Sequence, residues 1–218
     1  MIVLSMKPEE IYQEVMRDFV SIKRKAHTEG LILQQERQRK KQATLFRIIS
    51  YKTPHHNQWQ IIVSANAVGI KRGFYLKSRD NRGLAVYMIQ FINWGTHEQE
   101  TYVIKYNQHF FDRYNERMGL GLSETSRVIA HFFKYNLESE MGQTEMLQNG
   151  ICALHFVFPQ GMGIGWKDEA RKTIHVKTFI PNETMSKKLL SLAEHIKYSG
   201  DDDEFFIKVK QENIDKAF

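Results

Sequence analysis

Cysteine and proline are scarce in this sequence, and long apolar runs are missing. The single cysteine, Cys152, excludes an internal disulfide bond and is typical of proteins in a reducing compartment. No stretch approaches the roughly 18 consecutive apolar residues that a membrane-spanning helix requires. The first ten residues, MIVLSMKPEE, hold too short an apolar run for a signal peptide. We therefore expect a cytoplasmic protein that has no membrane partner.

The composition leaves little room for long linkers, because only 4 prolines and 13 glycines are spread over 218 residues. With 42% hydrophobic and 26% charged residues, the chain has a globular composition and is long enough to bury a core. We predict three regions: a basic helical N-terminal segment over residues 1–42, an α+β core domain over 43–199, and an acidic loop and tail over 200–218.

The positive charge is concentrated near the N-terminus. Residues 1–53 hold 11 Lys and Arg against 6 Asp and Glu, whereas the rest of the chain is nearly balanced, with 20 against 19. Basic clusters such as KRK and RQRKK suit phosphate backbones, although a solvated helix face has the same pattern. These clusters and the basic segment that begins at residue 71 contain the candidate nucleic-acid-binding residues: Lys23, Arg24, Lys25, Arg37, Arg39, Lys40, Lys41, Lys71 and Arg72.

The hydrophobic pattern predicts helices around a mainly antiparallel sheet. A helix capped by Ser5 is expected first, followed after Gly30 by a second, more polar helix. Runs rich in β-branched and aromatic residues predict strands between residues 44 and 106 and again between 151 and 180. Further helices are expected over about 107–118, 123–140 and 183–197, and FFIKVKQ near the C-terminus is either an edge strand or a mobile tail.

The segment HFFDRYNER, residues 109–117, is the most informative for chemistry. In a helix, His109, Arg113 and Arg117 share one face, because they are spaced four residues apart. Metal-free RNA cleavage needs proton transfer, which histidine performs near neutral pH, and cations that stabilise the negative charge on phosphorus, which arginine supplies. The alternative is a charged surface helix whose arginines pair with Asp112 and Glu116.

The longer segment HFFDRYNERMGLG resembles the helix signature H-x-x-x-R-x-x-x-R-G of small nucleases and toxins of the barnase–EndoU–colicin–RelE-like group. The resemblance covers about residues 101–181. In that group a compact antiparallel sheet follows the helix, and a terminal strand often carries a Thr or Ser near the active site. The resemblance therefore implies a toxin-like endoribonuclease without a cofactor, in which His109, Arg113 and Arg117 line the site and Thr178 contributes from the last strand.

The strand TIHVKTFI offers two different sets of polar groups. Strict alternation places Thr178 on the face of Ile174 and Val176, and it places His175 and Lys177 on the opposite face. His175 and Lys177 are therefore candidates for the second proton-transfer group and a further cation. The pattern does not indicate which face meets the helix. A metal site at His55 and His56 would need further ligands that the sequence does not supply, so no metal site is predicted.

Three hypotheses follow for the function. The first is a metal-independent ribonuclease that acts on RNA through the helix and the terminal strand. The second is a protein that binds RNA or DNA without catalysis. The third is a structural or interaction protein whose basic helix docks an acidic protein partner. The sequence does not indicate an oligomeric state.

Overall fold

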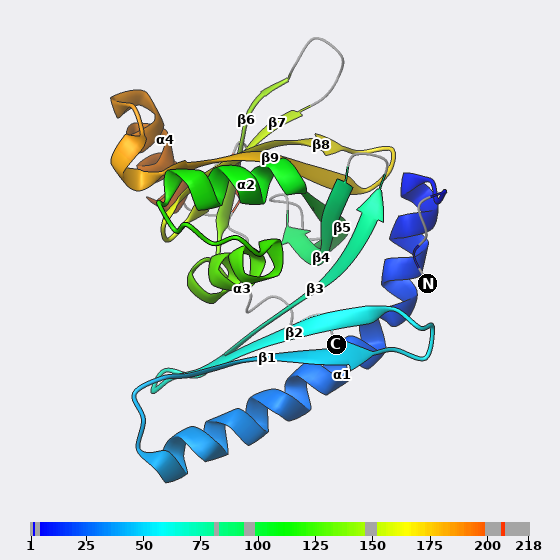
Figure 1. The fold of residues 1–218 in the computed structure, drawn as a ribbon. Helices are drawn as coiled ribbons and strands as arrows, with labels where there is room; N and C mark the ends of the chain where they lie inside the picture. The colour runs from blue at the N-terminus through cyan, green and yellow to red at the C-terminus, as the bar shows by residue number, and fades with distance from the viewer. Residues whose placement is uncertain are drawn as a thin grey trace.

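A long N-terminal helix and one continuous sheet organise the chain (Figure 1). The computed structural model describes residues 2, 5–80, 83–93, 99–146, 152–198 and 206–207. Within these residues the helices are α1 (Pro8–Lys40), α2 (Gln108–Arg117), α3 (Thr125–Tyr135) and α4 (Lys187–Tyr198). A short 3₁₀ turn, η1 (Asn182–Thr184), precedes α4.

The sheet has ten strands among the described residues, in the order β1-β2-β3-β4-β5-β9-β8-β7-β6-β10. All neighbours run antiparallel except β5 and β9, which are parallel. The strands are β1 (Leu45–Lys52), β2 (Gln58–Ala65), β3 (Ile70–Asp80), β4 (Gly83–Asn93), β5 (Gln99–Asn107), β6 (Glu140–Met146), β7 (Cys152–Phe158), β8 (Gly161–Asp168), β9 (Thr173–Pro181) and β10 (Phe206–Ile207). The predicted α+β class with a mainly antiparallel sheet is confirmed.

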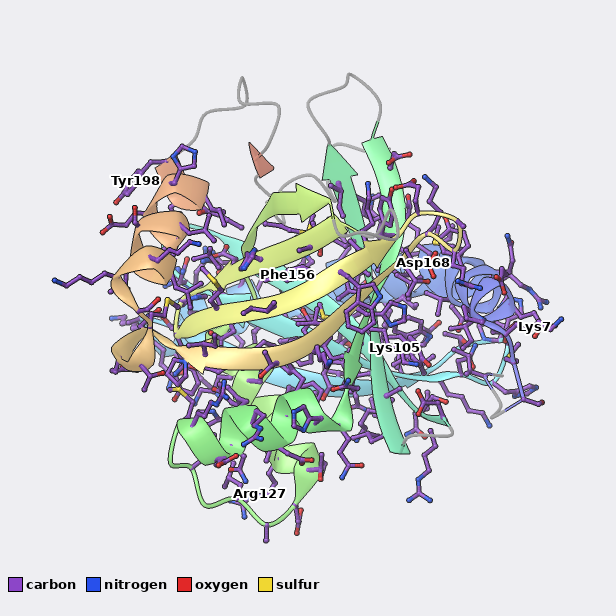
Figure 2. The ribbon with its side chains drawn as sticks, turned by 90° about the horizontal axis from the view of Figure 1, so that it is seen from above. Lys7, Lys105, Arg127, Phe156, Asp168 and Tyr198 are labelled. Carbon is purple, nitrogen blue, oxygen red and sulfur yellow. The ribbon has the colours of Figure 1, made fainter. Side chains whose placement is uncertain are left out.

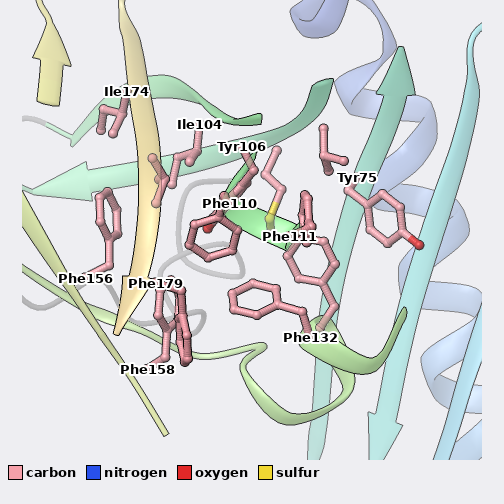
Figure 3. Close-up of a cluster of buried hydrophobic side chains, with 14 of the residues drawn as sticks. Tyr75, Ile104, Tyr106, Phe110, Phe111, Phe132, Phe156, Phe158, Ile174 and Phe179 are labelled. Atoms are coloured by element: carbon pink, nitrogen blue, oxygen red, sulfur yellow. The ribbon is translucent and has the colours of Figure 1, made fainter. Parts of the chain in front are cut away.

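Helices α2 and α3 lie between β6–β9 and β1–β3, so the sheet curves around them (Figure 1). We call the side of the sheet that meets them the inner face. An aromatic core fills this face, and Figure 3 shows rings from α2, α3 and the strands pointing toward one another. Phe110 and Phe132 make a typical edge-to-face contact, with centroids 5.1 Å apart. Phe110, Phe111 and Tyr114 form the buried side of α2.

Helices α1 and α4 pack on the opposite side, which we call the outer face. Alternate residues of β2–β5, including Trp59, Phe74 and Val103, pack against α1. Helix α4 covers a second region of the outer face, where it contacts Val157 and Met162 near the ends of β7 and β8. The strip of β5, β9, β8 and β7 between these regions belongs to the same face.

Helix α1 is continuous, so the predicted break at Gly30 is wrong. Gly30 is buried, and a Cβ atom there would lie 2.8 Å from Arg72 Nε and 2.9 Å from Ile70 Cγ2. Glycine at this position lets β3 approach the helix, and the packing against the sheet outweighs its low helix propensity. The helix also begins later than the predicted Ser5 cap. Its N-cap is Lys7, whose backbone N–H donates to the Glu10 carboxylate at 2.6 Å.

The predicted helix over residues 123–140 is too long. Helix α3 ends at Tyr135, and the Asn136 side chain donates to the Phe132 carbonyl at 3.0 Å and to Gln160 Oε1 at 2.8 Å. These contacts satisfy groups at the end of the helix and connect it to the β7–β8 turn. Residues Glu140–Met146 then form β6, an unpredicted strand whose partner is β7.

The strict alternation predicted for β9 is also wrong. The register between β8 and β9 shifts at Ile164 and Gly165, so that Ile164 pairs with Thr178 and Gly165 pairs with Val176. Lys177 is therefore the extra residue of a β-bulge, which reverses the faces of the residues that follow it. Thr178 lies on the outer face with His175, whereas Phe179 joins the inner core with Val176.

The C-terminal end is described in part. The predicted last helix begins at Lys187 rather than at residue 183, after the η1 turn. Phe206 and Ile207 pair with Gly142 and Met141 of β6, which agrees with an edge strand at this point of FFIKVKQ. The rest of that segment and the acidic run lie outside the described residues.

Candidate nucleic-acid interface

The outward side of α2 carries the three residues that the helix signature singled out. His109 is exposed. Arg113 Nη1 lies 2.7 Å from Glu116 Oε2, which is the local ion pair of the alternative prediction. Arg117 donates a hydrogen bond to the carbonyl oxygen of Phe179 on β9. Both guanidinium groups therefore have protein partners, and one of them attaches α2 to the end of β9.

The structure does not bring the candidate residues of β9 together with those of α2. His175 and Thr178 lie on the outer face of the sheet, whereas α2 packs on the inner face. The sheet and the aromatic core separate the two groups. Lys177 is exposed at the bulge. The predicted catalytic set thus falls into two separate surfaces.

A row of side chains crosses the outer face. In the strand register, Lys105 of β5 lies opposite His175 of β9, and His175 lies opposite Trp166 of β8. Trp166 in turn lies opposite Ala153 of β7. Paired side chains on neighbouring strands lie about 5 Å apart. The rings of Trp166 and His175 are stacked, with centroids 4.9 Å apart and an interplanar angle of 12°. The row therefore places a cation beside an aromatic pair.

A second row runs parallel to the first. His155 of β7 pairs with Ile164 of β8, and Ile164 pairs with Thr178 of β9. All residues of the two rows are partly exposed. Figure 2 looks toward β7–β9 from above, with α4 at one side and α1 at the other. We call the two rows together with Lys177 the outer patch: Lys105, Ala153, His155, Ile164, Trp166, His175, Lys177 and Thr178.

The charges of the outer patch are partly balanced. Lys105 Nζ lies 2.6 Å from Asp80 Oδ2 and 5.8 Å from the centroid of the Tyr87 ring. Lys177 is the exposed cation of the patch. At one end of these strands, Glu169 contacts Lys172 and Tyr102. Burial raises the pKa of Glu169, but hydrogen bonds from lysines and from Tyr102 outweigh it and lower the pKa to about 2.

Most predicted basic residues make contacts within the protein. Lys25 pairs with Glu29 at 2.7 Å, and Lys40 pairs with Glu36 at 2.6 Å. The other contacts are those of Arg37 with Gln34 and with the Gln42 carbonyl, and of Lys71 with Glu138. The Arg72 side chain lies beside Gly30 of α1, where an added Cβ atom would be 2.8 Å from Nε. Arg24, Arg39 and Lys41 are exposed, and Lys23 is partly exposed. Because α1 packs on the outer face, this basic helix and the outer patch share one side of the sheet.

Of the two histidines His55 and His56, the first has a structural role. His55 Nδ1 lies 2.9 Å from Oδ1 of the buried Asp18, which connects the β1–β2 turn to α1. Among the described residues, no group of three His, Cys, Asp or Glu side chains is arranged to hold a metal ion. No helix in the described ranges is both long enough and apolar enough to cross a membrane.

The sequence pattern predicts His175, Lys177 and Thr178 as candidates, but it does not predict that Trp166, His155 and Lys105 share a surface with them. Alternation along GMGIGWK puts Trp166 on the same face of its strand as Met162 and Ile164, and this is the sequence feature that could have indicated its position. The parallel pairing that brings β5 beside β9 has no local signal in the sequence.

Comparison with known proteins gives no relative: no protein family, no curated protein and no solved structure matches this chain.

Proposed function

We propose that this protein is an RNA-directed protein that binds single strands across the outer patch and cleaves them without a metal ion. The observation that carries the proposal is the stacked pair of Trp166 and His175, with Lys105 beside it and His155 in the neighbouring row. The order of elements over residues 101–181, two helices followed by antiparallel strands, agrees with the order that the resemblance to small nucleases implies, but the signature residues of α2 lie on the other face and are not part of this site.

The physical case for RNA rests on two properties of the patch. Unpaired bases stack on aromatic side chains whatever their sequence, and each stacked base contributes about 1–3 kcal/mol. Lysines near such a platform attract the phosphate backbone. The basic C-terminal turns of α1 lie beside β1 on the same side of the sheet, although the acidic N-terminal end of the helix is the part that lies nearer β5 and the β8–β9 turn. A reducing cytoplasm, which the single cysteine favours, is where such a substrate is met.

The cleavage step needs two proton-transfer groups. One neutral imidazole removes the proton from a ribose 2′-OH, and the 2′ oxygen forms a bond to phosphorus. The P–O5′ bond breaks, and a protonated imidazole returns a proton to the 5′ oxygen, which leaves a 2′,3′-cyclic phosphate and a 5′-OH end. His155 and His175 both rise from the outer face on strands separated by β8, about 10 Å apart laterally. A phosphodiester that lies over β8 is within reach of both side chains.

The experiment is cleavage of a pool of labelled single-stranded RNA in EDTA. We expect wild type to cleave, and we expect His155→Ala and His175→Ala each to lower the rate by at least 100-fold. His109→Ala on the exposed side of α2 is the matched histidine control and should retain activity. Cleavage that requires His109 but neither outer histidine would move the site to α2.

A second candidate is RNA binding without cleavage. The observation that favours it is that the His175 ring is stacked against the indole, which makes it a part of the binding platform. In this case wild type binds single-stranded RNA but releases no product in EDTA or in magnesium. Failure to bind RNA or DNA at low salt would contradict both candidates and favour an interaction protein with an acidic protein partner.

A further inference from the structure

We infer that the outer patch contains a slot for one unpaired nucleobase, over Ala153 and against the side of the Trp166 indole that faces β7. This inference rests on the proposed function, because it names where and how the RNA is bound. It adds a position for the base and a role for a residue without any polar group.

The sheet register defines the slot. The indole of Trp166 has His175 on the β9 side, where the two rings are parallel. On its β7 side the paired residue is Ala153, whose side chain is a single methyl group. Ala153 is itself partly exposed, although it lies in a strand that has neighbours on both sides. Among the described residues, the cross-strand neighbour on the β7 side of the indole is therefore a single methyl group.

The slot matches a nucleobase in shape and in surroundings. A base that stands parallel to the indole continues the stack that Trp166 and His175 begin, with the alanine methyl group beneath its edge. A base in a duplex is already stacked and paired, so it cannot enter. The slot thus selects single strands, and because stacking uses the face of the ring, it accepts any of the four bases.

The position of His155 gives the slot a direction. His155 follows Ala153 by two residues on β7, so the two side chains lie on the same face about 7 Å apart. This spacing is comparable to the distance between a base and its own ribose. A base over Ala153 therefore places a sugar near His155, which is the group that the proposed cleavage requires at the 2′-OH.

The test compares two RNA probes and two variants at one position. The first probe is an octamer of adenylate. The second is an abasic octamer, which carries the same phosphates but no bases. The variants are Ala153→Leu, which fills the slot, and Ala153→Ser, which adds one small polar atom and leaves it open. Each protein is first checked by circular dichroism and thermal unfolding, so that a folding defect is separated from a binding defect.

We expect wild type and Ala153→Ser to bind the adenylate octamer at least about tenfold more tightly than the abasic octamer. Ala153→Leu should lose this preference and bind the two probes alike, with unchanged affinity for the abasic one. Equal affinity of wild type for both probes, or a preference that survives in folded Ala153→Leu, would overturn the slot while RNA binding itself stands. If wild type binds neither probe at low salt, the proposed function fails and the slot fails with it.

If Ala153→Leu does not fold, Trp166→Leu and Trp166→Phe provide a second route. Leucine keeps apolar volume but has no ring, so it should remove the preference for the adenylate octamer, whereas phenylalanine should retain part of it. An adenylate preference that is the same in Trp166→Leu as in wild type would also overturn the slot.

Discussion

Replacement of Asp18 by asparagine should destabilise the protein strongly, because this carboxylate joins α1 to the sheet. Its side chain is fully buried. Oδ2 accepts hydrogen bonds from Trp59 Nε1 at 2.8 Å and from Asn57 Nδ2 at 2.7 Å, and His55 Nδ1 lies 2.9 Å from Oδ1. The substitution keeps the shape of the side chain, but it removes the charge and turns one acceptor oxygen into an NH₂ donor.

The magnitude follows from the donors that lose their partner. A buried polar group without a partner costs about 1–3 kcal/mol, and breaking a buried charged pair costs about 3–5 kcal/mol. We expect Asp18→Asn to lower the free energy of unfolding by about 3 kcal/mol. In a chain of this length, that corresponds to a fall in Tm of about 6–12 °C. Urea unfolding followed by circular dichroism measures the first quantity, and a thermal scan measures the second.

The pH dependence gives the same prediction a second test. Burial raises the pKa of Asp18, but hydrogen bonds from Trp59, Thr53, His55 and Asn57 outweigh it and leave the pKa below the usual 3.8. A depressed carboxyl pKa contributes stability that is complete above the unfolded pKa and is lost as the pH falls through the folded pKa. The gap between wild type and Asp18→Asn should therefore be constant near pH 7 and shrink below about pH 4. A cost under about 1 kcal/mol at pH 7 would refute the account of this cluster.

Three further substitutions test the packing and the α2 surface, each by urea unfolding. Gly165→Ala should cost about 2–3 kcal/mol, because its Cβ would lie 2.0 Å from the His175 carbonyl oxygen; a neutral result would contradict the close approach of β8 and β9. Tyr114→Phe should cost about 1–2 kcal/mol, since the buried hydroxyl makes two side-chain hydrogen bonds at 2.7 and 2.9 Å. Arg113→Ala should change stability by less than about 0.5 kcal/mol and leave RNA binding unchanged, because its ion pair with Glu116 is exposed.

The local sequence pattern predicts most of the helices and strands, but it does not predict the continuous helix at Gly30 or the bulge at Lys177. The apolar residues of α2, the β-rich runs and the α+β class all follow from spacing and residue type. The prediction of a helix break at Gly30 is wrong, because a side chain at this position would collide with Arg72 and Ile70 of β3. Glycine is therefore required by packing against another element, which the local sequence does not show. The bulge at Lys177 was missed for a related reason, since a bulge is defined by the register of two strands.

The candidate site shows the same division. Sequence periodicity placed His109, Arg113 and Arg117 on one side of a helix, as the structure does. Spacing gives the pair of Arg113 with Glu116 only as one of two alternatives, and it does not reveal that Arg117 bonds to a β9 carbonyl. The outer patch draws on four strands that are distant in sequence, so its composition depends on the strand order, which the chain does not state locally.

The most direct test of the central claim is the affinity of single-stranded RNA for Trp166→Ala beside Tyr135→Ala. Tyr135 is the matched control, because its ring also lies beside a histidine, His131, at 4.7 Å and near a lysine, but on the exposed side of α3. Fluorescence anisotropy with a labelled octamer of RNA measures both. We predict that Trp166→Ala weakens binding by at least about tenfold and that Tyr135→Ala leaves it unchanged. Unchanged affinity in Trp166→Ala, or a loss confined to Tyr135→Ala, would contradict the outer patch as the RNA-binding surface.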